Sequence, residues 1–307
     1  MTDLSLINEL NQKIEQNPMD FQARRELAIE FMNNGFNEDA LKQLCYLLKK
    51  FPEDSRLHYN AGIVLENLKS IDKAILSYQN ALNINPDEPD FLYNLGYAYL
   101  QIGEYNMAVP FFEKVIALEQ NDANSYFNLG YLHSKLLNFS IAIDYLNKAI
   151  ELNPNDYLAC FYLAFAIEKQ GDIDSAKSLY KQVLDMAPDY SWAYYNLGAI
   201  AFKENDFQQA KFYLQKTLEL NPKDSNASVV LANIFACEEN FDEALDILTK
   251  ANEENPYNGD VYYLQAQIYK SLDNIDECKS ALIQALNNSD TLSQNISILQ
   301  AELRSLS

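Results

Sequence analysis

The tetrad YNLG occupies residues 93–96 and returns at 195–198, with the near-copies YNAG at 59–62 and FNLG at 127–130. The four copies are separated by 34 residues or by a multiple of 34. Seven of the nine prolines keep the same spacing: Pro18, Pro52, Pro86, Pro154, Pro188, Pro222 and Pro256. Because proline and glycine interrupt regular structure, a period shared by both indicates an internal repeat.

A single frame accommodates the whole pattern. If the recurring proline is position 32, eight repeats cover residues 21–292 without an insertion, and they begin at 21, 55, 89, 123, 157, 191, 225 and 259. Position 8 is Gly or Ala in every repeat, and position 20 is Ala in all but the last, which has Cys278. Small residues at both positions predict a close approach of two helices, which offsets the ~1 kcal/mol that glycine costs in a helix.

Each repeat contains two stretches with helical periodicity. Apolar residues at positions 4, 7 and 11 predict a helix over positions 2–14, and those at 20, 24, 27 and 28 predict one over 18–31. Gly or Asn near position 15 suits the left-handed residue that ends a helix, and Asn-Pro at positions 31–32 stops the second helix.

The ends of the chain are predicted to be single capping helices, because terminal repeats need a lid with a polar outer face. Residues 3–17 bury Leu6, Leu10 and Ile14 in this prediction, and residues 293–307 bury Ile296, Leu299 and Leu303. The predicted organisation is therefore a capping helix in 1–20, the repeats in 21–292 and a second capping helix in 293–307, with nothing appended.

The repeat resembles the tetratricopeptide repeat, whose pattern is W-x2-L-G-x2-Y, then A-x3-F, then P, over 34 residues. Repeat 3 matches this pattern with Leu92, Leu95, Gly96, Tyr99, Ala108 and Phe112. Departures are local, such as Gln120 in place of the proline and Gln265 at position 7. The resemblance implies an all-α fold, a right-handed α-solenoid superhelix of antiparallel helix pairs, and a scaffold that binds proteins.

By the same resemblance, positions 2, 5, 6, 9, 12 and 13 of the first helices line a concave peptide-binding groove. At positions 2, 5, 9, 12 and 13 of repeats 2–6, ten of 25 side chains are aromatic. The predicted apolar contacts are Tyr59, Tyr93, Tyr97, Phe127, Tyr131, Leu158, Phe161, Phe165, Trp192, Tyr195 and Phe202. The predicted basic contacts are Arg56, Lys135, Lys169 and Lys203. The alternative for position 5 is packing against the neighbouring repeat.

The asparagines at position 6 are Asn60, Asn94, Asn128 and Asn196. In related proteins, asparagines at this position hold the backbone of an extended peptide, since the amide is both donor and acceptor. The alternative is that each amide bonds to a neighbouring helix. A clamp for the carboxylate of a chaperone tail is not predicted, because the third helix has Asn124 and Asn128 where the clamp needs two basic residues.

The net charge of -21 argues against a nucleic-acid partner, which basic residues would have to bind. The sequence has no apolar run long enough to insert into a membrane and no secretory signal, so we expect a cytoplasmic protein with reduced cysteines. His58 and His133 fall at packing positions 4 and 11 and are expected in the core.

No catalytic motif is present, so we predict a protein that is not an enzyme and needs no cofactor or metal. The predicted function is a scaffold that binds a protein or peptide in the groove. The alternatives are a structural subunit of a larger or homo-oligomeric assembly, or an accessory partner of a separate enzyme. The sequence predicts no oligomeric state.

Overall fold

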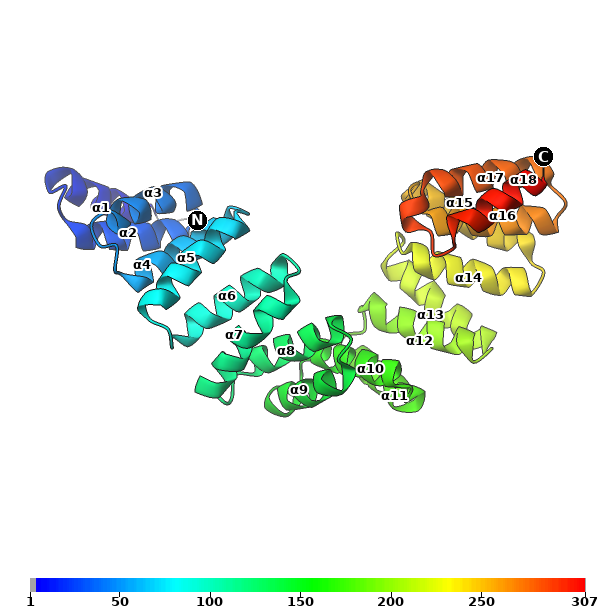
Figure 1. The fold of residues 1–307 in the computed structure, drawn as a ribbon, viewed down its shortest axis with the longest axis horizontal. Helices are drawn as coiled ribbons and strands as arrows, with labels where there is room; N and C mark the ends of the chain where they lie inside the picture. The colour runs from blue at the N-terminus through cyan, green and yellow to red at the C-terminus, as the bar shows by residue number, and fades with distance from the viewer. Residues whose placement is uncertain (1–3, 307) are drawn as a thin grey trace. The chain divides into compact units, whose positions relative to one another are not determined.

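The computed structural model describes residues 4–306, and in these residues all regular structure is helical (Figure 1). This confirms the predicted all-α solenoid class. The chain divides into two units, one up to Ala166 and one from Ile167 onward. The boundary lies within helix α10 (Tyr157–Gln170), and each unit is described by itself below.

The first unit contains α1 (Ser5–Gln16), α2 (Phe21–Asn33), α3 (Asn37–Leu48), α4 (Ser55–Asn67), α5 (Ile71–Ile84), α6 (Pro89–Gln101), α7 (Tyr105–Leu118), α8 (Ala123–Lys135), α9 (Phe139–Leu152) and most of α10. The second contains the end of α10, α11 (Ile173–Met186), α12 (Ser191–Lys203), α13 (Phe207–Leu220), α14 (Ser225–Cys237), α15 (Phe241–Glu254), α16 (Gly259–Ser271), α17 (Ile275–Asn287), the short 3-10 helix η1 (Ser289–Thr291) and α18 (Ile296–Ser305). The two helices of a repeat pack together, as α4 does with α5, and the second then packs on the next first helix, as α5 does on α6.

Local sequence sets the helix ends within about one residue of the prediction. Most first helices span positions 1–13 and most second helices positions 17–30 of the repeat. Position 15 has a positive φ in all eight repeats, at Gly35, Lys69, Gly103, Leu137, Gly171, Asn205, Glu239 and Asp273. The predicted left-handed residue is therefore confirmed, but in four repeats its side chain is neither Gly nor Asn.

Most first helices begin with an acidic or amide cap at the residue before position 1. The Asp54 side chain accepts a hydrogen bond from the backbone N–H of Leu57, and Asp20, Asp122, Asp156, Asp224 and Asn258 do the same in their repeats. Each such bond satisfies an N–H group that would otherwise have no partner in the helix. In repeat 3, Pro89 starts the helix instead, and it has no N–H to satisfy.

The glycines at position 8 are the contact point between the two helices of a repeat, as predicted. A Cβ on Gly198 would lie 2.8 Å from Cγ of Leu214, and one on Gly130 would lie 2.9 Å from Cδ2 of Leu146 and 3.2 Å from the carbonyl oxygen of Ala142. The alanines at position 20, such as Ala142, are completely buried in the same seam. Where glycine stands at this position an added carbon would therefore crowd the side chain at position 24, whereas the other four repeats accommodate a buried alanine there.

Helices α1 and α18 lie at the two ends of the described residues, but the prediction of the faces they bury was partly wrong. In α1 the buried residues are Ile7, Leu10 and Ile14, whereas Leu6 is exposed. In α18 only Leu299 is buried, and Ile296 is exposed. In α18 the physical reason is that η1 and its flanking residues precede the helix, which begins only at Ile296, whereas Leu299 and the partly buried Leu303 pack on the last repeat. Among the described helices, none is both long and apolar enough to cross a membrane.

Replacement of Leu137 by glycine is expected to stabilise the chain. Leu137 has a φ of 62° and is 72% exposed, so its side chain contributes little packing. A left-handed conformation destabilises a folded residue with a Cβ by about 1–2 kcal/mol, and glycine removes this strain. Glycine also loses more backbone entropy on folding, which offsets about 0.5–1 kcal/mol of the gain. Urea unfolding of Leu137→Gly should give a higher midpoint than wild type. Gly103→Leu, at the same position of the preceding repeat, should shift the midpoint down, and a fall for both variants would contradict the argument.

Replacement of Gly130 by alanine is expected to destabilise the chain by about 1 kcal/mol. Overpacking costs about 1–3 kcal/mol, which exceeds the ~1 kcal/mol that alanine gains as a helix former. Gly96→Ala is the matched control, because its Cβ would come no closer than 3.1 Å to Phe112. Circular dichroism during urea unfolding should show a larger loss for Gly130→Ala than for Gly96→Ala, and the reverse order would refute the role of the contact.

Candidate functional site: an aromatic face on the first helices

In the first unit, aromatic residues at positions 5 and 9 of the first helices lie one turn apart and stack. The ring centroids of Tyr93 and Tyr97 on α6 are 6.4 Å apart with nearly parallel planes, and those of Phe127 and Tyr131 on α8 are also 6.4 Å apart. Tyr97 is 39% exposed, and the other three are half-buried. Consecutive repeats therefore present rings at equivalent places.

Tyr162 on α10 joins this surface and was not predicted. Its ring lies 4.9 Å from that of Tyr131, in a T-shaped arrangement, and 6.0 Å from that of Phe127. The sequence signal was available, because Tyr162 stands at position 6, where repeats 2, 3, 4 and 6 have asparagine. We define the aromatic face as Tyr93, Tyr97, Phe127, Tyr131, Tyr162 and the half-buried Phe165, which is at position 9 of α10.

Two of the position 6 asparagines bond to the preceding repeat. Nδ2 of Asn94 donates to the hydroxyl oxygen of Tyr59 at 2.8 Å, and Nδ2 of Asn128 donates to that of Tyr93 at 3.1 Å. Burial raises the pKa of both tyrosines, so both hydroxyls remain protonated. Asn196 in the second unit donates to the carbonyl oxygen of Trp192 in its own helix at 2.7 Å. For Asn94 and Asn128 the structure thus shows the alternative reading, a bond to a neighbouring helix.

Two predicted contact residues lie too deep to form part of a surface. Asn128 is 5% exposed and Phe161 is 6% exposed. Phe161 packs with its ring 5.4 Å from that of Tyr162, which occupies the place where the other helices have the smaller asparagine. The prediction that these two side chains face a ligand is corrected, because both are buried and Asn128 bonds to Tyr93 of the preceding repeat.

The basic residues predicted in the groove have local partners. Arg56 pairs with Glu88 at 3.1 Å, and Nζ of Lys135 lies 5.2 Å from the ring centroid of Tyr131. The side chains of Lys135 and Lys169 are exposed. Lys135 is thus the basic residue in contact with the aromatic face, where it holds a cation over a ring.

The acidic residues at position 12 are held by buried tyrosines. In repeat 2 the hydroxyl of Tyr78 donates to Glu66 at 2.9 Å, and in repeat 5 the hydroxyl of Tyr180 donates to Glu168 at 3.0 Å. Burial and the neighbouring carboxylate raise the pKa of each tyrosine. Lys203 approaches Glu168 to 3.8 Å. These carboxylates therefore satisfy buried hydroxyls.

A separate aromatic patch lies on α12 in the second unit. Trp192 is 50% exposed, and its ring is 6.4 Å from that of Tyr195. Phe202 stacks on Phe207 at 6.0 Å, and Lys203 is exposed beside it.

The two remaining predicted contact residues lie in the first unit, where Leu158 and Asn60 are half-buried.

The histidines differ in burial, although both were expected in the core. His133 is buried, its ring stacks on Tyr145 at 5.6 Å, and burial lowers its pKa. His58 is only partly buried, and its Nε2 lies 2.8 Å from the carbonyl oxygen of Pro52. The prediction is therefore wrong for His58, whose polar ring reaches the backbone at the end of the preceding repeat.

Comparison with known proteins adds the family. Models of the tetratricopeptide repeat match residues 2–59, 68–103, 89–122, 123–156 and 168–234, and a model of subunit 3 of the anaphase-promoting complex, or cyclosome, matches 203–285. No relative among curated proteins matches the sequence.

Solved structures agree on the fold. YrrB, described as a TPR protein with an unusual peptide-binding site, is 25% identical with a TM-score of 0.52, over 60% of this chain and 95% of its own. MamA from Desulfovibrio magneticus RS-1 is 24% identical with a TM-score of 0.53, over 55% and 96%. The Cut9–Hcn1 hetero-tetramer of the APC/C gives 18% identity and a TM-score of 0.57, over 82% of this chain and 50% of the other. One 34-residue frame and repeat models that match most of the length show that the chain belongs to the tetratricopeptide repeat family, a family of protein-interaction scaffolds.

Proposed function

We propose that this protein is a non-catalytic scaffold whose aromatic face binds an extended, largely apolar segment of a partner protein. The observation that carries the proposal is the contact of Tyr162 on α10 with Phe127 and Tyr131 on α8, together with the stacked pair Tyr93 and Tyr97 on α6, of which Tyr97 is exposed. Aromatic side chains are favoured as energetic centres of interfaces. The similarity to a peptide-binding repeat protein, YrrB, supports the same reading.

The charge distribution supports an apolar ligand over an ionic one. The chain has a net charge of -21, yet at positions 2, 5, 9, 12 and 13 of repeats 2–6 the acidic residues Glu66, Asp90 and Glu168 are matched by Arg56, Lys135, Lys169 and Lys203. Lys135 lies over Tyr131, and Arg56 is already paired with Glu88. A ligand that enters this face therefore meets aromatic rings, with Lys135 beside them. On α12, Trp192, Tyr195, Phe202 and Lys203 offer a second proposed contact surface of similar chemistry.

All four cysteines are free thiols, and Cys160 and Cys278 are buried. Free thiols support the proposal that the protein works in a reducing compartment such as the cytoplasm. A second proposed role, assembly through the ends, is favoured by exposed apolar residues there: Leu4 just before α1, Leu6 on α1, and Ile296 and Ile298 on α18.

Charge introduced into the aromatic face should abolish partner binding. Tyr131→Glu/Phe165→Glu places two carboxylates among rings, where a partner's apolar side chain would have to desolvate them. Comparative affinity capture from host-cell lysate should recover a protein with wild type that the variant loses. Phe212→Glu, an exposed aromatic on α13, is the matched control and should capture as wild type does.

Circular dichroism must show that the double variant still folds, and Tyr97→Glu at the exposed edge replaces it if it does not. Equal capture by wild type and a folded variant would refute the aromatic face as the binding surface. It would leave the ends as the better candidate, which size-exclusion chromatography of wild type at rising concentration would then examine.

The role of the position 6 asparagines can be tested by comparing two of them. Asn94→Ala is expected to lower the unfolding free energy by about 1 kcal/mol, since it removes a hydrogen bond to the partly buried Tyr59 hydroxyl. Asn60→Ala is the control, because position 5 of the preceding repeat is Arg25, which pairs with Asp54 and offers no hydroxyl. Unchanged stability in Asn94→Ala, together with lost capture of the partner, would instead assign the amide to ligand binding.

A further inference from the structure

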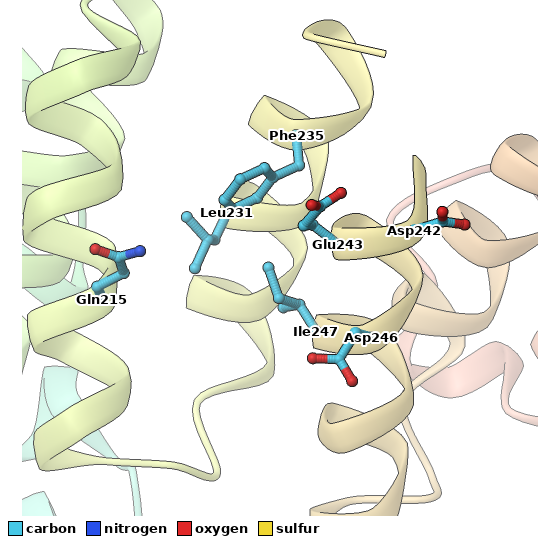
Figure 2. Close-up of a pocket in the computed structure, with 7 residues that line it drawn as sticks. All are labelled: Gln215, Leu231, Phe235, Asp242, Glu243, Asp246 and Ile247. Carbon is cyan, nitrogen blue, oxygen red and sulfur yellow. The ribbon is translucent and has the colours of Figure 1, made fainter. Parts of the chain in front are cut away.

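The second unit contains a hollow on the opposite side of the repeat from the position 5 and 9 residues. It lies between α13 and α15, above α14, and has a volume of about 530 Å³. Figure 2 shows Leu231 and Phe235 of α14 at its centre, Gln215 on one side, and Glu243 and Ile247 on the other. A second hollow of about 330 Å³ also contacts Ile247 and extends toward Leu218 and Pro222. We call the two together the α13–α15 valley.

Two side chains explain why the valley is open. At the equivalent place between α5 and α7, Gln79 donates to the hydroxyl of Tyr99 at 2.8 Å, and Tyr99 stacks on Phe111 at 5.8 Å. These side chains bridge the two second helices. In the valley the same repeat positions are Gln215, Phe235 and Ile247, so the glutamine has no hydroxyl to reach and the second ring is missing.

The valley has an apolar floor and an acidic edge. Asp242, Glu243 and Asp246 line it from α15, and Glu253 and Glu254 line the second hollow. Asp246 pairs with Lys250 at 2.6 Å, and Lys223 approaches Glu254 to 3.8 Å. Across the described residues, neither Asp242 nor Glu243 is in an ion pair within 4 Å. Their place in the first turn of α15 suits the helix dipole, but this does not account for the apolar surface beside them.

The nearby lysines do not neutralise this edge. Lys211 pairs with Glu238 at 2.8 Å, and its Nζ lies 5.2 Å from the ring centroid of Phe235. The ammonium group of Lys211 thus already lies over the Phe235 ring and is paired with the carboxylate of Glu238. The equivalent hollow between α11 and α13 is smaller, about 150 Å³, and its lining mixes Lys177 and Lys181 with Glu204 and Asp206, whereas the charged residues that line the larger hollow between α13 and α15 are all acidic.

We propose that the α13–α15 valley binds a basic amphipathic segment of a partner protein. A large apolar side chain of the segment contacts Leu231, Phe235 and Ile247. Lys or Arg side chains within one helical turn of it pair with Asp242 and Glu243. Charge complementarity selects this occupant, because basic side chains can pair with the exposed carboxylates of Asp242 and Glu243 beside the apolar floor. The proposal concerns a different surface from the aromatic face and does not rest on that assignment.

The test is a fluorescence anisotropy titration of the purified full chain with synthetic helical peptides. The probe is a labelled peptide of about 14 residues, or about four turns, with Leu on one face and Lys beside it. Companion peptides replace every Leu by Ala or every Lys by Glu. Wild type is expected to bind the Leu–Lys peptide at least about tenfold more tightly than either companion, and more weakly as salt rises.

Three protein variants locate the binding. Asp242→Asn/Glu243→Gln removes the acidic edge, and Phe235→Tyr/Ile247→Phe copies the closed arrangement of Tyr99 and Phe111. Each is expected to weaken binding at least about tenfold. Asp276→Asn/Glu277→Gln neutralises the same repeat positions on α17 and should bind as wild type does. This control is needed because a chain of net charge -21 attracts any basic peptide.

Several results would overturn the proposal. One is equal binding of the Ala–Lys and Leu–Lys peptides, and another is an equal loss in the valley variants and the α17 control. Absence of binding to wild type would also overturn it. The ring variant must keep the circular dichroism of wild type, and if it does not, the acidic-edge variant with its α17 control decides alone.

Discussion

The close approach of the two helices at position 8 is the constraint on which the rest of the structure depends. The atom that an added Cβ would meet at Gly62, Gly130 or Gly198 belongs in each case to the residue at position 24. That residue is Tyr78, Leu146 or Leu214, so at these glycines the side chain at position 24 sets how closely the two helices approach. Because the 34-residue frame recurs, equivalent positions of successive repeats face the same way, and the rings of Phe127 and Tyr131 meet Tyr162 one repeat later.

Most of the fold could be predicted because its determinants are local and periodic. Proline, glycine and small residues mark the helix ends and the contact point directly in the sequence. Leu137 and Lys69 show the limit of propensity, since both adopt the left-handed conformation that glycine has elsewhere. The packing of the flanking helices requires that turn whatever the residue is. The buried faces of α1 and α18 were predicted less well, because the repeat frame does not extend to them.

The sequence predicted which residues of the candidate site share a face, but not how far each side chain is exposed. The frame shows which positions share a face, but how far a side chain is exposed depends on what the neighbouring repeat supplies. Phe161 is buried, and Tyr162 takes the place that asparagine has elsewhere. The bond of Asn94 depends on a hydroxyl in the preceding repeat, at Tyr59. The hydrogen bond of Asn94 could have been predicted from the pairing of position 6 with position 5 of the preceding repeat.

Comparison of equivalent repeat positions also distinguishes the residues of the two proposed surfaces from those that build the repeat array. Gln79 and Gln215 occupy one repeat position, yet one bonds to a tyrosine hydroxyl and the other borders an open hollow. The backbone is shared, and the difference is a hydroxyl and a ring. In a repeat array the residues that obey the frame build the stack, because every repeat must satisfy the same contacts. Residues that depart from it, such as Tyr162 and Ile247, are free of that requirement, and binding chemistry can evolve there without loss of the fold.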